Sequence, residues 1–389
     1  MVVRLLYTLT LIIIVINLFL SISGYAKRKI VNKDYFPFVS VLCCAWNEEK
    51  VIERKIRNYL SQNYPKNKYE IIIVDNGSTD NTYKIAQKYK KTGKIKLLRL
   101  EKHEEYKSIG FDKAVRTLAK GEIILHSDAD TICERDWIRK MVFYFKDKTV
   151  SGVAGKIGVG NYKSGLIPKL RSLEFSFLYD LSSFGTYFLS GVSFFCGANY
   201  GLRKKDLLNV GGHGKDIVED FLLGLKFISR GMKIVPANAF VYQEEMTSFS
   251  QFVKQRKRWY YMIFNSKNYN KYVAGFFKKK PLAFILNTAR GGAQISMMLN
   301  FILLFFMPYH SLLNYFILAV IYLLGIESKP ENTVFYIPFY LILEPFMWTY
   351  VILALLKDKI KNKNVRWEKI YHKGEKFPKD VLSYLGYNI

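Results

Sequence analysis

Cysteine and histidine are scarce in this chain, which has 389 residues with 4 cysteines and 5 histidines. The cysteines lack the spacing of zinc ligands, which excludes the common cysteine-based metal sites. Cys43 and Cys44 end an apolar run, and we interpret them as small core residues. His126 and His213 have no partner at a catalytic spacing, and we expect both to be structural.

Acidic residues are also few, since 32 Asp and Glu are set against 59 Lys and Arg, which gives a net charge of +27. The chain has no internal repeat and no low-complexity linker. Half of its residues are hydrophobic, and they gather at the two ends. Because soluble domains are seldom both this apolar and this basic, we attribute the charge to membrane lipids and a phosphorylated substrate. We expect no nucleic acid partner.

Residues 5–22 form an apolar run of about the ~17–25 residues that a membrane span needs. Basic residues follow at 27–29, and no small-residue cleavage site is evident. We therefore predict a retained transmembrane anchor over residues 1–30. The positive-inside rule then places the following domain in the cytoplasm, where disulfides are not expected.

A second apolar region, residues 275–356, predicts further membrane helices and a multi-pass protein of the cell membrane. The candidate spans are residues 283–307, 312–326 and 334–356. Three full spans would place the basic tail, residues 357–389, outside, whereas its charge favours the cytoplasm. One segment is therefore expected to be interfacial or re-entrant. The weak points are Arg290-Gly291-Gly292 and Glu344-Pro345, and the sequence leaves the choice open.

The middle of the chain, residues 31–274, alternates strand and helix patterns, which is typical of an α/β domain with a mainly parallel sheet. Strands are predicted at residues 38–44, 70–74, 94–100 and 122–127. Helices are predicted at residues 48–62, 80–89, 107–119 and 215–230. Residues 166–189 are apolar but interrupted by charges, and we expect an amphipathic helix lying on the membrane.

Polar residues follow three of these strands, at residues 45–49, at 75–80 and at Asp128 and Asp130. Because parallel strands end at one edge of a sheet, these clusters should meet there. Paired carboxylates suit Mg²⁺ or Mn²⁺, which commonly share their coordination with substrate phosphates. A dehydrogenase would need a Gly-rich turn after the first strand, and residues 45–49 do not form one.

In order and spacing, these motifs resemble family-2 glycosyltransferases with the GT-A fold. The resemblance covers residues 39–259 and includes three stretches: Asp128-Ala129-Asp130, then Gly211-Gly212 followed by Glu219-Asp220, then a QxxRW motif at residues 255–259. It implies a GT-A type, mainly parallel sheet flanked by transmembrane helices. It also implies a metal-dependent, inverting sugar transfer from a nucleotide diphosphate sugar, with a UDP-sugar favoured.

The resemblance implies roles on the donor side. Asn47 and Glu49 would flank the nucleoside, Ala45 stands where the family often has proline, and Asp75 would accept a hydrogen bond from the base. Lys107 would lie beside the phosphates, although a solvated lysine is nearly as plausible. Asp130 would hold Mg²⁺ or Mn²⁺ directly, and Asp128 would support the ribose or the same ion.

On the acceptor side, the resemblance makes Asp220 the catalytic base. Gly197 and Ala198 would line the acceptor pocket, with Gln255, Arg258 and Trp259 contacting the sugar or the diphosphate. The acceptor would be a membrane lipid or a growing glycan, and QxxRW slightly favours processive polysaccharide synthesis. The alternatives are a single-sugar lipid glycosyltransferase and, from another class, a non-catalytic nucleotide-binding membrane or export protein.

Overall fold

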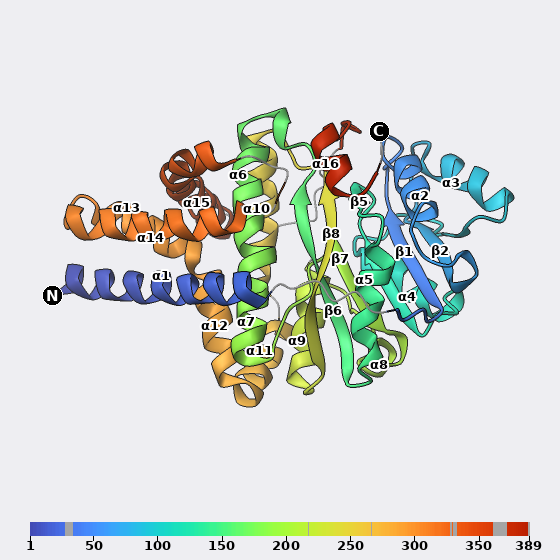
Figure 1. The fold of residues 1–389 in the computed structure, drawn as a ribbon, viewed down its shortest axis with the longest axis horizontal. Helices are drawn as coiled ribbons and strands as arrows, with labels where there is room; N and C mark the ends of the chain where they lie inside the picture. The colour runs from blue at the N-terminus through green and yellow to red at the C-terminus, as the bar shows by residue number, and fades with distance from the viewer. Residues whose placement is uncertain are drawn as a thin grey trace.

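The computed structural model places a sheet domain on one side of the molecule and a group of apolar helices on the other (Figure 1). It describes residues 1–27, 34–216, 218–265, 267–326, 329, 333–360 and 372–387. Three helical segments are long and apolar enough to cross a membrane: Val2–Ala26, Pro308–Ile326 and Val334–Ile360.

One eight-stranded sheet, in the order β3-β2-β1-β4-β7-β6-β8-β5, forms the centre of the domain. Its first half is parallel and consists of β1 (Val39–Ala45), β2 (Tyr69–Asp75), β3 (Lys96–Arg99) and β4 (Ile123–Ser127). β1, β2 and β4 are apolar runs buried on both faces, as expected for parallel strands between helices, whereas β3 at the sheet edge is only partly buried. The predicted positions of all four are confirmed within a few residues.

The second half of the sheet is mixed. It contains β5 (Thr131–Cys133), β6 (Val150–Val159), β7 (Asn199–Arg203) and β8 (Lys233–Gln243). β7 runs antiparallel to β4 and β6, whereas β8 is parallel to β6 and antiparallel to β5. The antiparallel strand β7 therefore joins the two parallel parts of the sheet.

The helices α2 (Ile52–Leu60), α3 (Thr82–Lys91) and α4 (Lys107–Thr117) pack on the first half of the sheet. The predicted start of the first helix, residue 48, is wrong. The backbone N–H of Glu48 donates to Thr82 Oγ1 at 2.7 Å and that of Glu49 to Asp80 at 3.1 Å, which holds these residues in a loop.

Four further helices belong to the sheet domain: α5 (Trp137–Phe143), α8 (Lys204–Asn209), α9 (Glu219–Ser229) and α16 (Lys379–Tyr384). The helix predicted from residue 215 is α9, which begins at Glu219. Asp216 lies before it and accepts a hydrogen bond from the Val218 N–H at 3.3 Å. The acidic pair Glu219–Asp220 therefore occupies the first turn of α9.

The segment predicted as a surface helix on the membrane lies mostly inside the molecule, and this expectation is corrected. It forms α6 (Leu166–Phe175), a π-helical stretch Ser176–Leu181 and α7 (Ser182–Ser190). Arg171 and Glu174 are each 1% exposed and form a buried ion pair, and Glu174 also pairs with Arg256. The charges that suggested a polar surface are thus neutralised in the interior, as buried charges require.

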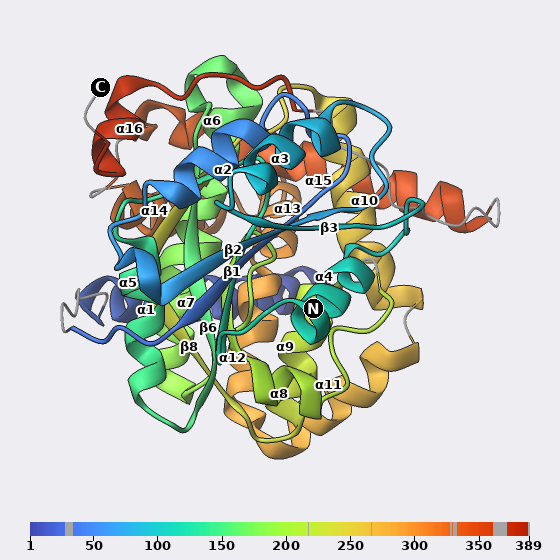
Figure 2. The same ribbon diagram turned by 90° about the vertical axis from the view of Figure 1, so that its right-hand side faces the viewer.

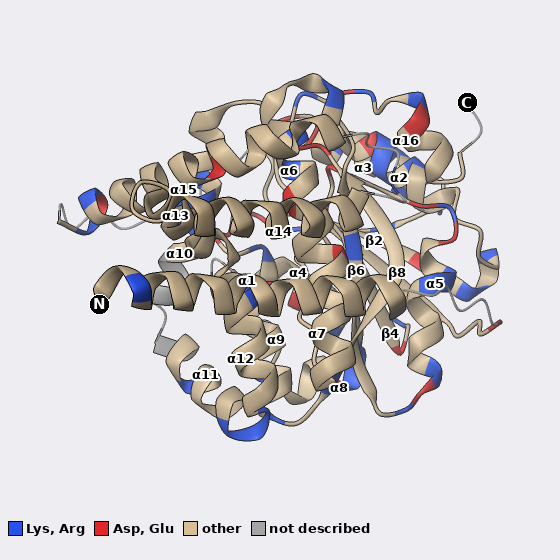
Figure 3. Ribbon diagram, turned by 60° about the vertical axis from the view of Figure 1, so that its left-hand side comes forward, with Lys and Arg blue, Asp and Glu red and all other residues tan. Residues whose placement is uncertain are grey.

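The apolar helices are α1 (Val2–Lys27), α12 (Pro281–Gly291), α13 (Ala293–Leu303), α14 (Pro308–Ile326) and α15 (Ile337–Ile360). Figure 3 shows the ribbons of α1, α13 and α14 almost free of charged residues beyond the N-terminus. The predicted span 283–307 is interrupted at Gly292, and each half has 11 residues, too few to cross a bilayer. α10 (Phe249–Asn265) and α11 (Lys267–Lys279) connect these helices to the sheet domain.

The C-terminal residues 372–387 return to the sheet domain and lie beside α2 (Figure 2). Phe377, Val381 and Leu385 are at most 5% exposed and belong to the same core as β1 and β2. The Arg135 N–H donates to the Leu385 carbonyl at 2.8 Å. The predicted basic tail therefore ends in a segment that is part of the folded domain.

The contact between α1 and α7 generates a stability prediction. A Cβ at Gly185 would overlap the Leu20 carbonyl, and one at Gly24 would overlap the Leu181 carbonyl, so the two helices touch through their backbones. Gly185→Val should destabilise the protein by about 1–3 kcal/mol or more, because overpacked sites cannot relax freely. Thermal unfolding of the full chain in detergent measures this. Gly291→Ala is the control, since nothing lies within 4 Å of that added Cβ, and equal midpoints would contradict the packing argument.

Candidate active site

A cavity of about 1040 Å³ opens at the carboxyl edge of the parallel strands and continues to the apolar helices. Ten of the predicted site residues line it: Ala45, Lys107, Asp128, Asp130, Gly197, Ala198, Asp220, Gln255, Arg258 and Trp259. The helices contribute apolar side chains to its lining, including Ile13 and Ile16 of α1, Phe276 of α11 and Ile285 of α12, and also polar ones such as Arg290 and Gln294. One cavity thus joins the two carboxylates of the strand edge to the region of the membrane helices.

Two side chains, Lys107 and His126, contact the Asp128 carboxylate. Lys107 Nζ lies 3.1 Å from Asp128 Oδ1, and His126 Nε2 lies 3.1 Å from the same oxygen. Burial alone would raise the pKa of Asp128, but Lys107 and His126 hold that pKa well below its usual range. His126 itself is buried, with Nδ1 3.0 Å from the Leu42 carbonyl. It is structural, as predicted, and its position fixes Asp128.

Asp130 has a partner that the sequence did not reveal. His372, from the C-terminal segment, lies with Nε2 3.3 Å from Asp130 Oδ2 and Nδ1 3.0 Å from Glu48 Oε2. Burial opposes the charged imidazolium, but Asp130 and Glu48 raise the pKa of His372 to about 9. Burial raises the pKa of Asp130. Nothing in the local sequence around His372 points to this site, because the contact depends entirely on the return of the chain.

Glu244, just after β8, holds the C-terminal segment in place. Its carboxylate accepts hydrogen bonds from the N–H groups of Lys373, Gly374 and Glu375 at 2.6, 3.1 and 3.1 Å. Arg54 lies 3.4 Å from the same carboxylate and donates to the carbonyls of Glu375 and Asp130. A carboxylate that accepts successive backbone N–H groups fixes their positions, and here it fixes His372 beside Asp130.

Lys107 also connects the two sides of the cavity, because its Nζ lies 3.3 Å from Glu219 Oε1. Burial opposes its charge, yet Asp128 and Glu219 raise the pKa of Lys107 well above its ordinary value. The neighbouring Asp220 faces Gly197, where a Cβ would lie 2.9 Å from Asp220 Oδ2. Only a glycine leaves this space open in front of the carboxylate.

The QxxRW residues lie on α10. Gln255 accepts a hydrogen bond from Arg171 at 3.3 Å, and the guanidinium of Arg256 lies 4.5 Å from the centre of the Trp259 ring. Arg258 lies among acidic groups of the cavity, with Glu219, Asp220 and Asp128 as its electrostatic neighbours. Gln255, Arg258 and Trp259 of the motif therefore all line the cavity, and Gln255 is also held by the buried Arg171.

Asn47, Glu49 and Asp75 do not line this cavity. The side-chain Oδ1 of Asn47 accepts a hydrogen bond from the Thr79 N–H at 2.8 Å, and the Glu49 carboxylate accepts one from the Asn81 N–H at 3.1 Å. Both therefore join the loops after β1 and β2. Asp75 is 0% exposed, the hydroxyl and N–H of Ser78 face its carboxylate, and Arg99 Nε lies 3.5 Å away. Burial raises the pKa of Asp75.

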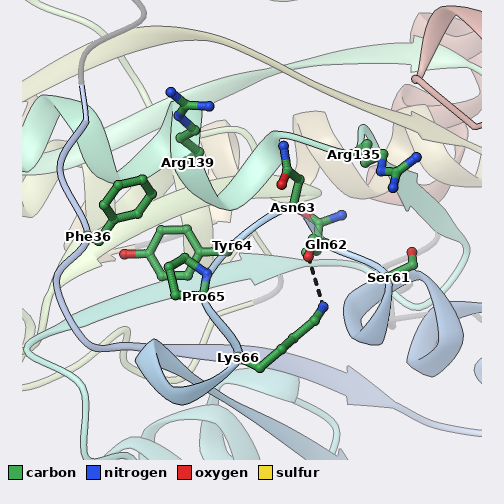
Figure 4. Close-up of a pocket in the computed structure, with 9 residues that line it drawn as sticks. All are labelled: Phe36, Ser61, Gln62, Asn63, Tyr64, Pro65, Lys66, Arg135 and Arg139. Atoms are coloured by element: carbon green, nitrogen blue, oxygen red, sulfur yellow. Dashed lines mark hydrogen bonds between the residues drawn. The ribbon is translucent and has the colours of Figure 1, made fainter.

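A second cavity, of about 500 Å³, lies at residues 61–66 (Figure 4). Two of its basic side chains, Lys66 and Arg139, already have partners. Lys66 donates to the Gln62 carbonyl at 2.9 Å, and Arg139 pairs with Asp34 at 2.5 Å. We therefore assign the chemistry to the larger cavity.

The role of Glu244 can be tested without substrate. Glu244→Gln replaces a charged acceptor of three backbone N–H groups, and hydrogen bonds to charged groups contribute about 1.5–3 kcal/mol each. Amide hydrogen exchange over residues 372–387 should therefore become faster by about tenfold or more. The exposed Glu101→Gln is the matched control, and unchanged exchange in the Glu244 variant would show that Glu244 does not hold the segment.

Comparison with known proteins agrees with the geometry. Residues 40–211 match the sequence profile of glycosyl transferase family 2. A β-monoglucosyldiacylglycerol synthase from Nostoc sp. is 30% identical over 229 residues, which cover 57% of this chain and 48% of that protein. A poly-β-1,6-N-acetyl-D-glucosamine synthase from Staphylococcus aureus is 26% identical over 236 residues, covering 60% and 56%. The matches thus span about half the length of these curated relatives.

A solved structure extends the comparison to the apolar helices. The mannosyltransferase PcManGT from Pyrobaculum calidifontis, in complex with GDP-Man and Mn²⁺, superposes with a TM-score of 0.63 at 18% identity. The superposition covers 94% of this chain and 100% of the other, so the likeness of fold includes the helices beside the sheet domain. Residues 40–211 of this chain thus carry a family 2 glycosyltransferase domain with the GT-A fold, and the part of the chain that the structure describes has three helices long and apolar enough to cross a membrane.

Proposed function

We propose that this protein is a membrane-bound, metal-dependent, inverting glycosyltransferase that moves a sugar from a nucleotide diphosphate sugar to a membrane lipid. One observation carries this proposal: a single cavity is lined by Asp128 and Asp130 at the strand edge, by Asp220 and by the apolar helices. Donor, base and acceptor would therefore occupy one continuous space, as a single displacement requires.

The donor would lie along the strand edge, with a UDP-sugar favoured. Asp75, which ends β2 and is an acceptor when ionised, is suited to the imide N–H of uracil. The base would reach it once the loop of residues 76–78 moves, and Asn47 and Glu49 would support the nucleoside by shaping that loop. Lys107 and Arg258 supply positive charge for the diphosphate.

The metal would bind at Asp130 and His372, with Asp128 nearby. No three ligand-type side chains converge on one point within the described ranges, which fits ions that take their remaining ligands from phosphate and water. One carboxylate and one imidazole suit Mn²⁺, and Mg²⁺ would rely more on the carboxylates. When bound, the ion would neutralise charge on the departing nucleoside diphosphate.

Asp220 would act as the base. The acceptor hydroxyl gives its proton to the Asp220 carboxylate, and its oxygen forms a bond to the anomeric carbon from the face opposite the leaving group. The bond from that carbon to the diphosphate breaks, and the nucleoside diphosphate leaves with the electron pair. Burial, and then Glu219, raise the pKa of Asp220 to about 6, which improves it as a proton acceptor near neutral pH.

The apolar end of the cavity favours a lipid acceptor over the polysaccharide that the QxxRW motif favours. Ile13 and Ile16 of α1 and Ile285 of α12 would contact acyl chains rather than sugar hydroxyls. Partly exposed apolar side chains continue along α12 and α13, for example Leu282 and Ile295. A lipid could therefore enter from the side with its headgroup directed toward Asp220.

The same structure supports a multi-pass topology with a cytoplasmic catalytic domain. Residues 372–387 pack on the sheet domain, so the chain must cross the membrane an even number of times between the two. The break at Gly292 leaves α14 and α15 as the two crossings. The charges at Lys357 and Lys359 then lie on the same side as the catalytic domain, in agreement with the positive-inside rule.

The base assignment is tested by Asp220→Asn in the full chain, purified in nanodiscs and supplied with labelled nucleotide sugars. Transfer should fall by about 10²–10⁴-fold, the usual contribution of a general base. Binding of the nucleotide should persist, because Asp220 does not contact the strand edge. Asp206→Asn on α8 is the control and should transfer like the wild type. Full activity of the Asp220 variant would overturn the assignment.

The pH profile gives a second measure of the same group. A base must be ionised, so kcat/KM of the wild type should fall as the pH drops through about 6 and level off above it. The residual rate of Asp220→Asn should lack this limb. If the variant shows the same fall in kcat/KM at low pH as the wild type, the titration belongs to another group.

The metal site is tested by titrating Mn²⁺ and Mg²⁺ against the UDP-bound protein. Asp130→Ala should lose metal-dependent nucleotide binding. His372→Ala should raise the metal concentration that half-saturates the UDP-bound protein by roughly ten- to a hundredfold or more. The control is the exposed His310→Ala. Nucleotide binding that is unchanged by EDTA and by both substitutions would contradict the proposal.

A further inference from the structure

Arg290 lies in the last turn of α12 and lines the large cavity at the level of the apolar helices. Its Nη1 is enclosed, and no hydrogen-bond acceptor reaches this atom from any residue that the structure describes. The end of α12 is held by α1, where Asn17 Nδ2 donates to the Ala289 carbonyl at 3.1 Å. A guanidinium held in such a place, with an unmet donor, costs free energy unless a ligand pairs with it.

Arg290 lies on the acceptor side of the base. Tyr179 and Cys196 line the cavity together with Arg290, and Cys196 directly precedes Gly197, which faces Asp220. Arg258, in contrast, is surrounded by Glu219, Asp220 and Asp128. The two arginines therefore serve different parts of the cavity. We assign Arg258 to the donor phosphates, whereas Arg290 lies on α12, among the apolar helices that line the cavity.

We propose that Arg290 binds the phosphate of an anionic acceptor lipid and thereby places a headgroup hydroxyl in front of Asp220. This inference rests on the proposed function and names its acceptor class. Guanidinium groups pair with phosphate through two parallel hydrogen bonds, which would satisfy the enclosed donor. The apolar residues beside Arg290, including Ile285 and Ile295, would contact the acyl chains. A neutral diacylglycerol or a sugar polymer offers no charge to this site.

The first arm of the test measures binding. The full chain is placed in phosphatidylcholine nanodiscs, and retention of labelled dioleoyl phosphatidylglycerol or labelled dioleoylglycerol is compared. The wild type should retain the phosphatidylglycerol at least about tenfold better than Arg290→Gln does, because hydrogen bonds to charged groups are lost. Arg290→Lys keeps the charge, so its retention of phosphatidylglycerol should lie between those of the wild type and Arg290→Gln. Such retention also shows that the site still folds when Arg290 is replaced. Lys280→Gln removes an exposed charge from the start of the same helix and should bind like the wild type.

Two results of this arm would overturn the inference. One is equal retention of phosphatidylglycerol by the wild type and Arg290→Gln. The other is equal retention of the anionic and the neutral lipid by the wild type. Free glycerophosphate, added as a competitor, separates a site for phosphate alone from a site for the lipid. Displacement by glycerophosphate at concentrations near those of the lipid would also contradict the proposal.

The second arm measures sugar transfer and separates this inference from the proposed function. With a nucleotide sugar that the wild type uses, Arg290→Gln should raise KM for phosphatidylglycerol by about tenfold or more and leave nucleotide binding unchanged. Loss of nucleotide binding would place Arg290 in the donor site and overturn the inference. If no nucleotide sugar is used by any variant, the proposed function fails, whereas the binding arm still decides whether Arg290 selects an anionic lipid.

Discussion

The cavity depends on the balance of charge around its crowded carboxylates. Asp128 and Glu219 share Lys107, whereas Asp130 and Glu48 share His372. Without these cations the carboxylates would repel each other in a partly dry space, and some of them would take up protons. Lys107 begins α4 and Glu219 begins α9, so the same ion pair also fixes the distance between the donor and acceptor halves. The ion pairs of Lys107 therefore determine both the charge balance of the site and the position of its two halves.

The same principle operates where the sheet domain meets the apolar helices. Arg171 pairs with Glu174 and Glu245, and Arg256 shares Glu174. These ion pairs join α6, α10 and the end of β8 in a region that is otherwise apolar. Removing one partner of such a network leaves a buried charge, which is strongly destabilising. Gln255, bonded to Arg171, is part of this network. The QxxRW motif thus lines the cavity and, through Gln255, also belongs to the buried ion-pair network that supports it.

The parts that local chemistry determines could be predicted from the sequence. The four parallel strands are short apolar runs that end in polar residues, so their edge and its carboxylates at Asp128 and Asp130 followed directly. The burial of α6 and α7 could not be predicted, because charges such as Arg171 look solvent-exposed until their partners are known. His372 could not be found either. Its contact with Asp130 exists only because Phe377, Val381 and Leu385 fill the core beside β1 and β2.

That return of the chain links the catalytic site to the membrane region. Because residues 372–387 complete the surroundings of Asp130, the topology that we propose requires the helices between them and α10 to bring the chain back to the same side of the membrane. A third full span would prevent this, and the break at Gly292 removes it. The same break ends α12 at the cavity, where Asn17 holds its last turn and Arg290 lines the wall. The break at Gly292 therefore fits the proposed topology and also positions Arg290, where we propose that the acceptor lipid binds.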